Sequence, residues 1–380
     1  MKKKILFVTE RRADYSKLRP VIKEIQGSDK FDYYLVVTGS HLLKKYGYTI
    51  NEIKKDGFRI YKKFNMFYEN EGDDPSTMTM AFGRAVFNLT KIIKSLKPDV
   101  VFAGFDIGGN FAVAIIGAHM NIHVAHLEGG EVTGTIDEPI RHAISKFSHI
   151  HFTSNKEATK RLIMMGENPK NIFTVGNPSL DAIKATKFIA KDELEREFKI
   201  NLRKPFLLVV QHTVTTEITD IDKYFLQTIK AIKELNIQSI IIAGNIDAGS
   251  QKIKKIIKNS KITYYDHLQF EKYISLLRYC SVIVGNSSSG IMEAPFLRVP
   301  SVSIGTRQEG RSKAKSIINV GYNKKHIKKA IKKAITDKKF LGSIKAQKNL
   351  HGDGSGAKRI VQILEKLDLK KIPIQKKLAY

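Results

Sequence analysis

The chain has 380 residues, 42% of them hydrophobic and 27% charged, so it is a globular protein long enough for two separate hydrophobic cores. No apolar run approaches the roughly 20 residues that span a bilayer, and the single cysteine, Cys280, excludes an intramolecular disulfide and is typical of a cytoplasmic protein. The net charge of +28 would suit a nucleic-acid binder, but the lysines alternate with apolar residues at helical spacing and no zinc-finger or RNA-binding signature is present. We therefore expect no membrane insertion, no nucleic-acid partner, and a positive field that attracts an anionic substrate.

Short apolar runs alternate with longer helical patterns along the first part of the chain. Strands are predicted at Ile5–Thr9, Tyr34–Thr38, Val100–Ala103, Ile122–His126, Ile150–Thr153 and Ile172–Val175, with helices such as Ala81–Leu96 and Lys156–Met165 between them. Because strands that alternate with helices pair in parallel through right-handed crossovers, this rhythm predicts an α/β fold. We expect one doubly wound, Rossmann-like domain over residues 1–180.

Asn177-Pro178 is a stop signal, and a charged, helix-prone segment follows it. After that segment, short apolar runs again alternate with helical patterns. Further strands are predicted at Phe206–Gln211, Ser239–Ala243, Ile262–Tyr265, Val282–Val284 and Ser301–Ile304. They indicate a second Rossmann-like, nucleotide-binding domain over residues 181–367, with a tail at 368–380. The last helix, about Gly356 to Leu367, is a candidate to cross back onto the first domain. Two such domains facing a cleft are the architecture expected of nucleotide-sugar enzymes.

The segment that follows the predicted strand Ile122–His126 is unusually rich in acidic residues. Within thirteen positions it carries His126, Glu128, Glu131, Asp137 and Glu138, with a glycine pair between them. Ligands of an open parallel sheet bind outside the carboxyl ends of its strands. Carboxylates crowded there repel one another, so we expect one or more to keep its proton near neutral pH, as an enzyme that moves protons to and from carbon requires. The alternative is a solvated loop.

A second candidate site is the turn Gly285-Asn286-Ser287-Ser288-Ser289-Gly290, between the strand Val282–Val284 and a helix predicted from Ile291. Free backbone amides, hydroxyl groups and the positive end of the helix dipole would all point at an anion there. Glu293 is expected near ribose hydroxyls, and Arg307 or Arg311 could reach the same phosphates. The alternative is an ordinary N-cap, which serine also provides.

Taken together, these segments resemble the hydrolysing UDP-N-acetylglucosamine 2-epimerases. The resemblance is most specific over His126–Lys146 and extends to Arg12–Leu18, Thr38–His41, Asn245–Ser250, Gly285–Ser288 and Gly305–Gln308. It implies a glycosyltransferase-B-like fold with the active site in the interdomain cleft. It also implies release of UDP from UDP-N-acetylglucosamine through a 2-acetamidoglucal, giving free N-acetylmannosamine for sialic acid synthesis. Close relatives act on diacetamido sugars of the legionaminic acid type, carried by UDP or GDP.

The resemblance also implies a role for individual residues. Asp106, Glu128 and Asp137 fall on the proton-transferring carboxylates, His212 on a catalytic histidine and Arg141 on an active-site arginine. Nucleotide contacts fall on Arg12, Ser16, Asn245, Ser287, Ser288, Glu293 and Arg307, and a substrate-side histidine falls on His41. We expect no metal and no other cofactor, because no set of His, Asp and Glu residues has diagnostic ligand spacing. We expect a homo-oligomer, either a dimer or a tetramer.

Several of these roles have a structural alternative. Asp106 could be the N-cap of a helix before Phe111, and His212 could be a buried histidine with satisfied hydrogen bonds. Arg141 could pair only with Asp137 at helical spacing, and His41 could simply begin a helix. The sequence does not divide the roles of base and acid among the carboxylates.

Three other functions remain open. A retaining glycosyltransferase of similar fold often has two glutamates eight positions apart, but Gly285 and Ser301 stand eight positions from Glu293. A non-hydrolysing 2-epimerase would return UDP-N-acetylmannosamine. The sequence motifs that such enzymes usually carry in their first domain fit this chain less well. A nucleic-acid binder would show binding to random duplex that depends steeply on salt.

Overall fold

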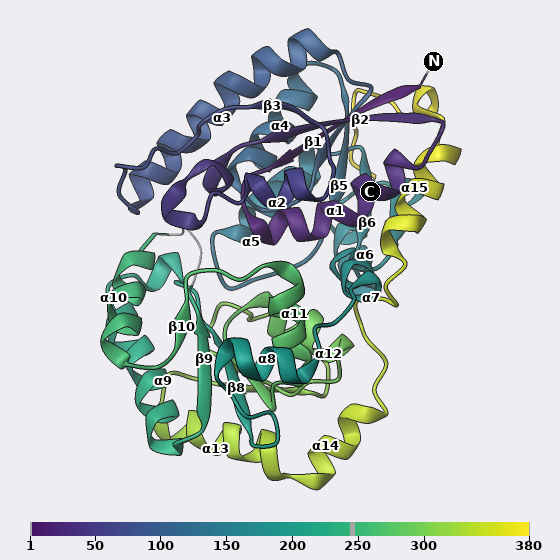
Figure 1. Cartoon of the computed structure of the whole chain (residues 1–380). Coiled ribbons are helices and arrows are strands. Elements are labelled where there is room, and N and C mark those ends of the chain that lie inside the picture. The colour runs from purple at the N-terminus through teal and green to yellow at the C-terminus, as the bar shows by residue number, and fades with distance from the viewer. Residues whose placement is uncertain (1, 244–247, 380) are drawn as a thin grey trace. The chain divides into compact units, whose positions relative to one another are not determined.

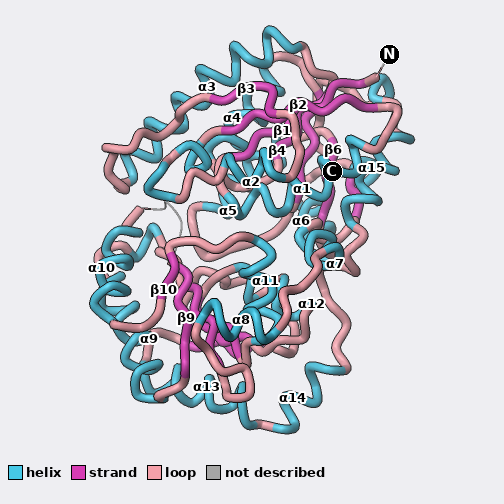
Figure 2. Tube along the Cα trace, in the orientation of Figure 1, coloured by secondary structure: helices cyan, strands magenta, loops and turns pink. Residues whose placement is uncertain are grey.

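The computed structural model describes residues 2–243 and 248–379, and the chain divides into two compact units. Unit 1 comprises Met1–Glu131, Ile136–Lys184 and His351–Tyr380, and unit 2 comprises Val132–Thr135 and Ala185–Leu350. Each unit is built on one parallel β-sheet with helices packed around it (Figures 1 and 2). The predicted fold class, two Rossmann-like α/β domains, is therefore confirmed.

The sheet of unit 1 has seven parallel strands in the order β3-β2-β1-β4-β5-β6-β7. The strands are β1 (Lys3–Thr9), β2 (Phe31–Val37), β3 (Ile60–Lys63), β4 (Val100–Ala103), β5 (His123–Leu127), β6 (Ile150–Thr153) and β7 (Ile172–Thr174). Six of these were predicted, with ends shifted by a few residues. The edge strand β3 was missed because its sequence, Ile-Tyr-Lys-Lys, is half-buried or exposed and carries no apolar run.

The helices of unit 1 are α1 (Arg12–Gln26), α2 (Ile50–Lys55), α3 (Pro75–Leu96), α4 (Gly108–His119), α5 (Asp137–Phe147), α6 (Lys156–Met164), α7 (Ser179–Ala185) and α15 (Gly356–Lys366). Helix α3 begins well before the predicted Ala81. Asp74 caps it by accepting hydrogen bonds from the backbone amides of Ser76 at 2.8 Å and Thr77 at 3.0 Å. Pro75 takes the first helical position, where its missing amide proton costs nothing.

Helix α15 belongs to unit 1, although it follows the whole of unit 2 in the sequence. Its apolar residues Ile360, Val361 and Leu364 are buried in the same core as Leu18 and Ile22 of α1. Figure 1 shows α15 in yellow beside the purple α1. The chain thus crosses back onto the first unit, as the last predicted helix allowed. The predicted second domain, residues 181–367, differs accordingly from unit 2, which ends at Leu350 and includes Val132–Thr135.

The sheet of unit 2 has six parallel strands in the order β10-β9-β8-β11-β12-β13. They are β8 (Phe206–Val210), β9 (Gln238–Ile242), β10 (Tyr264–Tyr265), β11 (Val282–Gly285), β12 (Ser301–Ile304) and β13 (Ile317–Val320). The edge strand β13 was missed, since it is only partly buried. The helices are α8 (Lys191–Phe198), α9 (Ile221–Leu235), α10 (Ser250–Ser260), α11 (Phe270–Tyr279), α12 (Glu293–Phe296), α13 (Lys324–Thr336) and α14 (Lys338–Lys345).

The strand orders locate the expected ligand positions in each unit. In unit 1 the winding reverses between β1 and β4, and in unit 2 it reverses between β8 and β11. Doubly wound sheets bind ligands at this switch point, outside the carboxyl ends of the strands. Among the described residues, no helix is long and apolar enough to cross a membrane.

Candidate active site

The turn after β1 is organised by a buried carboxylate, Asp14. It accepts hydrogen bonds from Thr9 Oγ1 at 2.9 Å and from the backbone amides of Glu10 at 2.9 Å and Arg11 at 3.0 Å. These bonds cap the start of α1, where Arg12 is the first residue, and Ser16 follows with its hydroxyl donating to the Ala13 carbonyl at 3.0 Å. The turn therefore holds the first residues of α1 at the switch point of unit 1.

His41 lies behind this turn and is completely buried. Its Nε2 is 3.0 Å from Thr9 Oγ1 and its Nδ1 is 2.7 Å from Thr49 Oγ1. Burial, helped by the charge of Arg12, lowers the pKa of His41 to about 3, so the ring is neutral. With both ring nitrogens held by threonines, His41 supports the turn. Its predicted contact with the substrate stays a prediction. His41 lies in the short 3-10 helix η1 (Gly39–Leu42).

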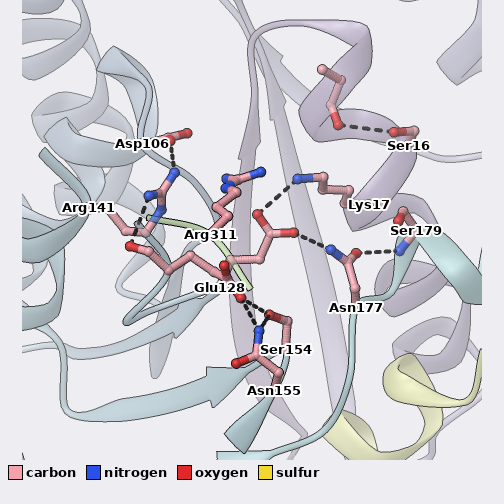
Figure 3. A network of polar contacts seen from close by, with 12 residues as sticks. Ser16, Lys17, Asp106, Glu128, Arg141, Ser154, Asn155, Asn177, Ser179 and Arg311 are labelled. Carbon is pink, nitrogen blue, oxygen red and sulfur yellow. Dashed lines mark hydrogen bonds and ion pairs between the residues drawn. The ribbon is translucent and has the colours of Figure 1, made fainter. Parts of the chain in front are cut away.

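Glu128 follows β5 directly and forms the centre of a polar network (Figure 3). Its Oε2 lies 2.9 Å from Lys17 Nζ, and its Oε1 accepts a hydrogen bond of 2.6 Å from Asn177 Nδ2. Asn177 is itself fixed by the backbone amide of Ser179, which donates to its Oδ1 at 2.9 Å. The backbone of Glu128 has a φ of 61°, in the left-handed region that non-glycine residues rarely occupy. The strained turn and two donors together hold this carboxylate in one position.

Arg141, one turn into α5, is among the largest fully buried side chains of the described residues. Its Nη2 forms an ion pair with Asp106, and its Nη1 donates to the Glu131 carbonyl oxygen at 3.1 Å. Burial alone would lower the pKa of Arg141, but the fields of four carboxylates outweigh it and raise the pKa. In decreasing order these are Asp106, Glu128, Asp137 and Glu131. The guanidinium is therefore the electrostatic centre of the acidic cluster.

The positions of Asp106 and Arg141 exclude the structural alternatives given for these two residues. The N-cap of α4 is Ile107, so Asp106 is not a helix cap. Arg141 is paired with Asp106 on another element, so it does more than balance Asp137 one turn away on α5. Asp137 is half-buried and begins α5.

The mutual repulsion expected within the acidic cluster is offset by donors. Glu128 accepts from Lys17 and Asn177, and Asp106 faces Arg141. The Glu131 carboxylate accepts from Ser154 Oγ and, at 2.5 Å, from Asn155 Nδ2. The cluster is therefore a set of positioned acceptors around a buried cation. The solvated-loop alternative is wrong, because Glu128 and Glu131 are both buried.

In unit 2 the ends of β8 and β11 approach each other closely at Gly285. Its φ is 134°, and a Cβ at this position would lie 2.1 Å from the Val210 carbonyl oxygen, so only glycine fits. The next residue, Asn286, is buried and binds the backbone of His212 at both polar atoms. Its Oδ1 accepts from His212 N at 2.6 Å, and its Nδ2 donates to His212 O at 2.9 Å.

Asn286 also anchors the loop that follows β12. Its carbonyl oxygen accepts hydrogen bonds from Arg307 Nη1 at 3.3 Å and from Gln308 Nε2 at 2.8 Å. One asparagine thus joins the half-buried His212, the serine turn and Arg307 at the switch point of unit 2.

The serine turn differs in part from its prediction. Ser287 Oγ accepts from the Ser289 amide at 3.3 Å, which is the capping role that the alternative foresaw, and Ser288 begins the 3-10 helix η5 (Ser288–Gly290). The helix predicted from Ile291 starts at Glu293 and has only four residues. A helix this short has a small dipole, so an anion here would be bound mainly by hydroxyls, amides and Arg307.

The chain matches the model of the family described as UDP-N-acetylglucosamine 2-epimerase over residues 23–365. It belongs to this family. A relative from Legionella pneumophila, named UDP-N,N'-diacetylbacillosamine 2-epimerase (hydrolyzing), is 36% identical over the full length of both chains. The GDP/UDP-N,N'-diacetylbacillosamine 2-epimerase (hydrolyzing) of Campylobacter jejuni is 34% identical, with 85% of each chain covered.

The fold of this 2-epimerase family member agrees with solved structures. The crystal structure of UDP-GlcNAc 2-epimerase from Neisseria meningitidis bound to UDP-GlcNAc superposes with a TM-score of 0.82 at 20% identity, covering 96% of this chain and all of that one. The family resemblance predicted from the sequence is confirmed by the match to the family model and by the identity to the Legionella and Campylobacter relatives.

The residues predicted for the epimerase site fall into two groups, one in each unit. Unit 1 gathers Asp106, Glu128, Asp137 and Arg141, with Arg12 and Ser16 at the start of α1. Unit 2 gathers His212, Ser287, Ser288 and Arg307 around Asn286, with Glu293 at the start of α12. Asn245 lies outside the described residues.

Three residues that hold the site residues in position were not predicted from the sequence. Lys17 is one of 65 basic residues and was given no role, although it lies within the stretch Arg12–Leu18 that carries the resemblance. Asn177 was interpreted only as part of an Asn-Pro stop signal, and Asn286 only as part of the serine turn. Among residues 2–243 and 248–379, no group of three His, Cys, Asp or Glu side chains is arranged to hold a metal ion.

Proposed function

We propose that this protein is a hydrolysing 2-epimerase, which converts a nucleotide-linked 2-acetamido sugar into the free 2-epimeric sugar and the nucleotide. The observation that carries the proposal is the cluster of carboxylates held by Arg141 and Lys17 at the carboxyl ends of β4 and β5. Such acceptors suit the removal and return of a proton on carbon. The names of the Legionella and Campylobacter relatives support the hydrolysing type.

In the proposed first step, a carboxylate of unit 1 takes the proton from C2 of the sugar. The electrons of the C2–H bond form the C1–C2 double bond, and the bond between C1 and the phosphate oxygen breaks. The products are a 2-acetamidoglucal and the nucleoside diphosphate. A C2 proton is weakly acidic, so departure of the diphosphate must help to drive its loss. We assign proton handling to Glu128, Asp106 and Asp137, each of which typically contributes about 10²–10⁴-fold in such a role.

Unit 2 is proposed to stabilise the departing diphosphate. Arg307 offers a guanidinium, and Ser287 and Ser288 offer hydroxyls and amides, so negative charge that develops on the leaving group meets donors already in place. The backbone of His212 is fixed by Asn286, and we assign to its side chain either protonation of the diphosphate or a hydrogen bond to it. We assign Glu293 to the ribose hydroxyls.

In the proposed second step, water adds to C1 of the glucal and C2 receives a proton on the opposite face. The sum of both steps consumes one water and yields the free sugar with inverted C2 and the nucleotide. No metal or redox change is needed for this balance. The initial base is regenerated when the proton on it is returned to solvent or to substrate.

The proposed substrates are UDP-N-acetylglucosamine, giving N-acetylmannosamine, or a diacetamido sugar on UDP or GDP, giving the free sugar of the sialic or legionaminic acid pathways. The diacetamido sugar is favoured because the relatives from Legionella and Campylobacter carry diacetylbacillosamine in their names and match this chain over most of their length. We place the enzyme in the cytoplasm, consistent with its one cysteine, Cys280, which is free and buried.

A substrate panel tests the proposal. The protein is incubated with UDP-N-acetylglucosamine and with UDP- and GDP-linked diacetamido sugars, nucleotides are separated by anion exchange, and sugars are identified by NMR. Free nucleotide with a free 2-epimeric sugar is the expected result. A nucleotide-linked 2-epimer would instead establish the non-hydrolysing type, and intact substrates throughout would contradict both.

A further inference from the structure

The last described residues of the chain pack against unit 1, which binds them through hydrogen bonds. We call residues 372–379 the C-terminal segment. His123 Nε2 lies 2.9 Å from the Ile372 carbonyl oxygen, and His149 Nε2 lies 3.0 Å from that of Ile374. The Ala379 amide donates to the Gly166 carbonyl at 2.8 Å. Ile372 is also buried in the core of unit 1, so this segment is held at several points along its length.

Lys376 is the charged residue through which this segment reaches the interior. Its Nζ donates to the Ser145 carbonyl oxygen at 2.6 Å and forms an ion pair with Glu167, whose side chain is completely buried. The Glu167 carboxylate also faces Lys146 at 3.1 Å and His151 at 3.1 Å. Burial opposes ionisation of Glu167, but the hydrogen bond and charge of His151, with the charge of Lys376, outweigh it and lower its pKa to about 2. Lys376 therefore faces a carboxylate that is ionised at neutral pH.

Ser145 connects Lys376 to the acidic cluster. It lies one turn after Arg141 on α5, and its hydroxyl donates to the Arg141 carbonyl at 3.1 Å and lies 3.2 Å from His126 Nδ1. Arg141 in turn holds Asp106 and the Glu131 carbonyl. A continuous series of polar contacts thus runs from the C-terminal segment, through the last turn of α5, to the cation at the centre of the carboxylates.

We propose that Lys376 is a positioning residue for the 2-epimerase reaction, holding the end of α5 so that Arg141 and Asp106 keep their catalytic geometry. This inference rests on the proposed function for its effect on rate, but its effect on α5 is independent of that function. A cation beside the carbonyls of the last helical turn also interacts favourably with the helix dipole. Without it, the Ser145 carbonyl and Glu167 lose a shared donor. The end of α5 is then tied to Glu167 through Lys146, which still allows the helix end to shift.

The test compares Lys376→Met with Lys377→Met, which changes the next residue, an exposed lysine. We expect Lys376→Met to lower kcat by about tenfold or more, because small displacements of catalytic groups are costly. Lys377→Met should stay within about twofold of wild type, the level expected for a surface change. The Kd for UDP, measured by calorimetry, should change less than about twofold in both variants, since UDP is assigned to unit 2.

Hydrogen exchange supplies the readout that does not depend on activity. Amides of α5 should exchange faster in Lys376→Met than in Lys377→Met, while the helices of unit 2 exchange as in wild type. If Lys376→Met does not fold, Lys376→Gln keeps a donor for Ser145 without the charge, and its kcat should fall at least about threefold. Unchanged kcat and unchanged α5 exchange in the folded variant would overturn the proposal. A wild-type protein without 2-epimerase activity would instead refute the proposed function, while the exchange of α5 would still decide whether Lys376 holds that helix.

Discussion

At the scale of single residues, the site depends on cations that are matched to carboxylates inside unit 1. Arg141 is buried, pairs with Asp106 and feels the fields of three further acidic residues. Lys17 plays the corresponding part for Glu128. A carboxylate that is both buried and hydrogen-bonded is held in place, and this precision is what proton transfer to carbon requires.

Replacing Arg141 by lysine should harm both stability and activity. Lysine keeps the charge but cannot bind Asp106 and the Glu131 carbonyl with one planar group. We expect a loss of about 2–4 kcal/mol in the free energy of unfolding, because a buried cation loses the paired geometry with the partly buried Asp106 carboxylate. Arg196→Lys is the matched control, since Arg196 and its partner Asp192 are largely exposed, and it should cost less than about 1 kcal/mol. Equal urea-denaturation midpoints for the two variants would count against a structural role of the buried pair.

Lys17→Met should reduce kcat/KM by about 10²-fold or more, because Glu128 would lose one of the two side-chain donors that the described residues give it, and with it its fixed position. Lys23→Met, on the exposed face of the same helix, should remain close to wild type. Initial rates of nucleotide release measure both. If the two variants were equally active, the Lys17–Glu128 pair would have no part in catalysis.

His41 predicts a dependence of stability on pH. Its pKa in the folded protein is about 3, below the ordinary 6.5, because burial disfavours the charged ring. Between these two values the unfolded chain binds the proton and the folded protein does not, so the free energy of unfolding falls as pH is lowered through this window. His41→Gln should reduce that slope between pH 5 and pH 6 by up to ~1.4 kcal/mol per pH unit, measured by urea titrations. An identical slope in the variant would mean that His41 titrates normally.

Sequence alone predicts some of these residues and not others, for physical reasons. The acidic cluster stands out because carboxylates are unusual directly after a buried strand. Lys17 does not stand out in the sequence, because its role depends on a contact with Glu128, which lies 111 positions away along the chain. The role of Asn286 likewise depends on the adjacency of β8 and β11, which a sequence pattern cannot measure.

At the scale of elements, the interior strands and the edge strands β7 and β10 were predicted, and the edge strands β3 and β13 were not. Apolar runs such as Val100–Ala103 mark strands buried on both faces. Strands β3 and β13 each have a partner on only one side and carry mixed sequences, so they leave no such run. The last helix was a candidate to cross back onto the first domain, but the pattern alone could not decide this, because an amphipathic helix shows that it has a buried face and not which core receives it.

The placement of α15 predicts that its buried face stabilises unit 1. Ile360→Ala should lower the free energy of unfolding by about 2–4 kcal/mol, as expected for a cavity in a packed core. Gln362→Ala, at an exposed position of the same helix, should cost less than about 0.5 kcal/mol. Thermal unfolding followed by circular dichroism compares the two. A large loss of stability in Gln362→Ala and none in Ile360→Ala would contradict the assignment of Ile360 to the buried face of α15.

At the scale of the whole molecule, the net charge of +28 favours the capture of an anionic substrate. Raising ionic strength from about 0.05 to 0.5 M should lower kcat/KM for the nucleotide sugar by about threefold to tenfold, through slower association, and leave kcat nearly constant. Steady-state kinetics at several salt concentrations test this. A kcat/KM that does not respond to salt would show that the charge has no role in binding.

The homo-oligomer expected from the sequence stays a prediction, which light scattering can examine.

The central claim is that carboxylates of unit 1 remove and return the proton on C2 of a nucleotide sugar. Its most direct test is the deuterium content at C2 of the sugar released in deuterium oxide, by the wild type and by Glu128→Gln. The proposed mechanism requires a 2-epimeric free sugar fully deuterated at C2 from the wild type, and slower formation of this sugar, by about 10²-fold or more, in the variant. A released sugar that keeps its original configuration and carries no deuterium would contradict it.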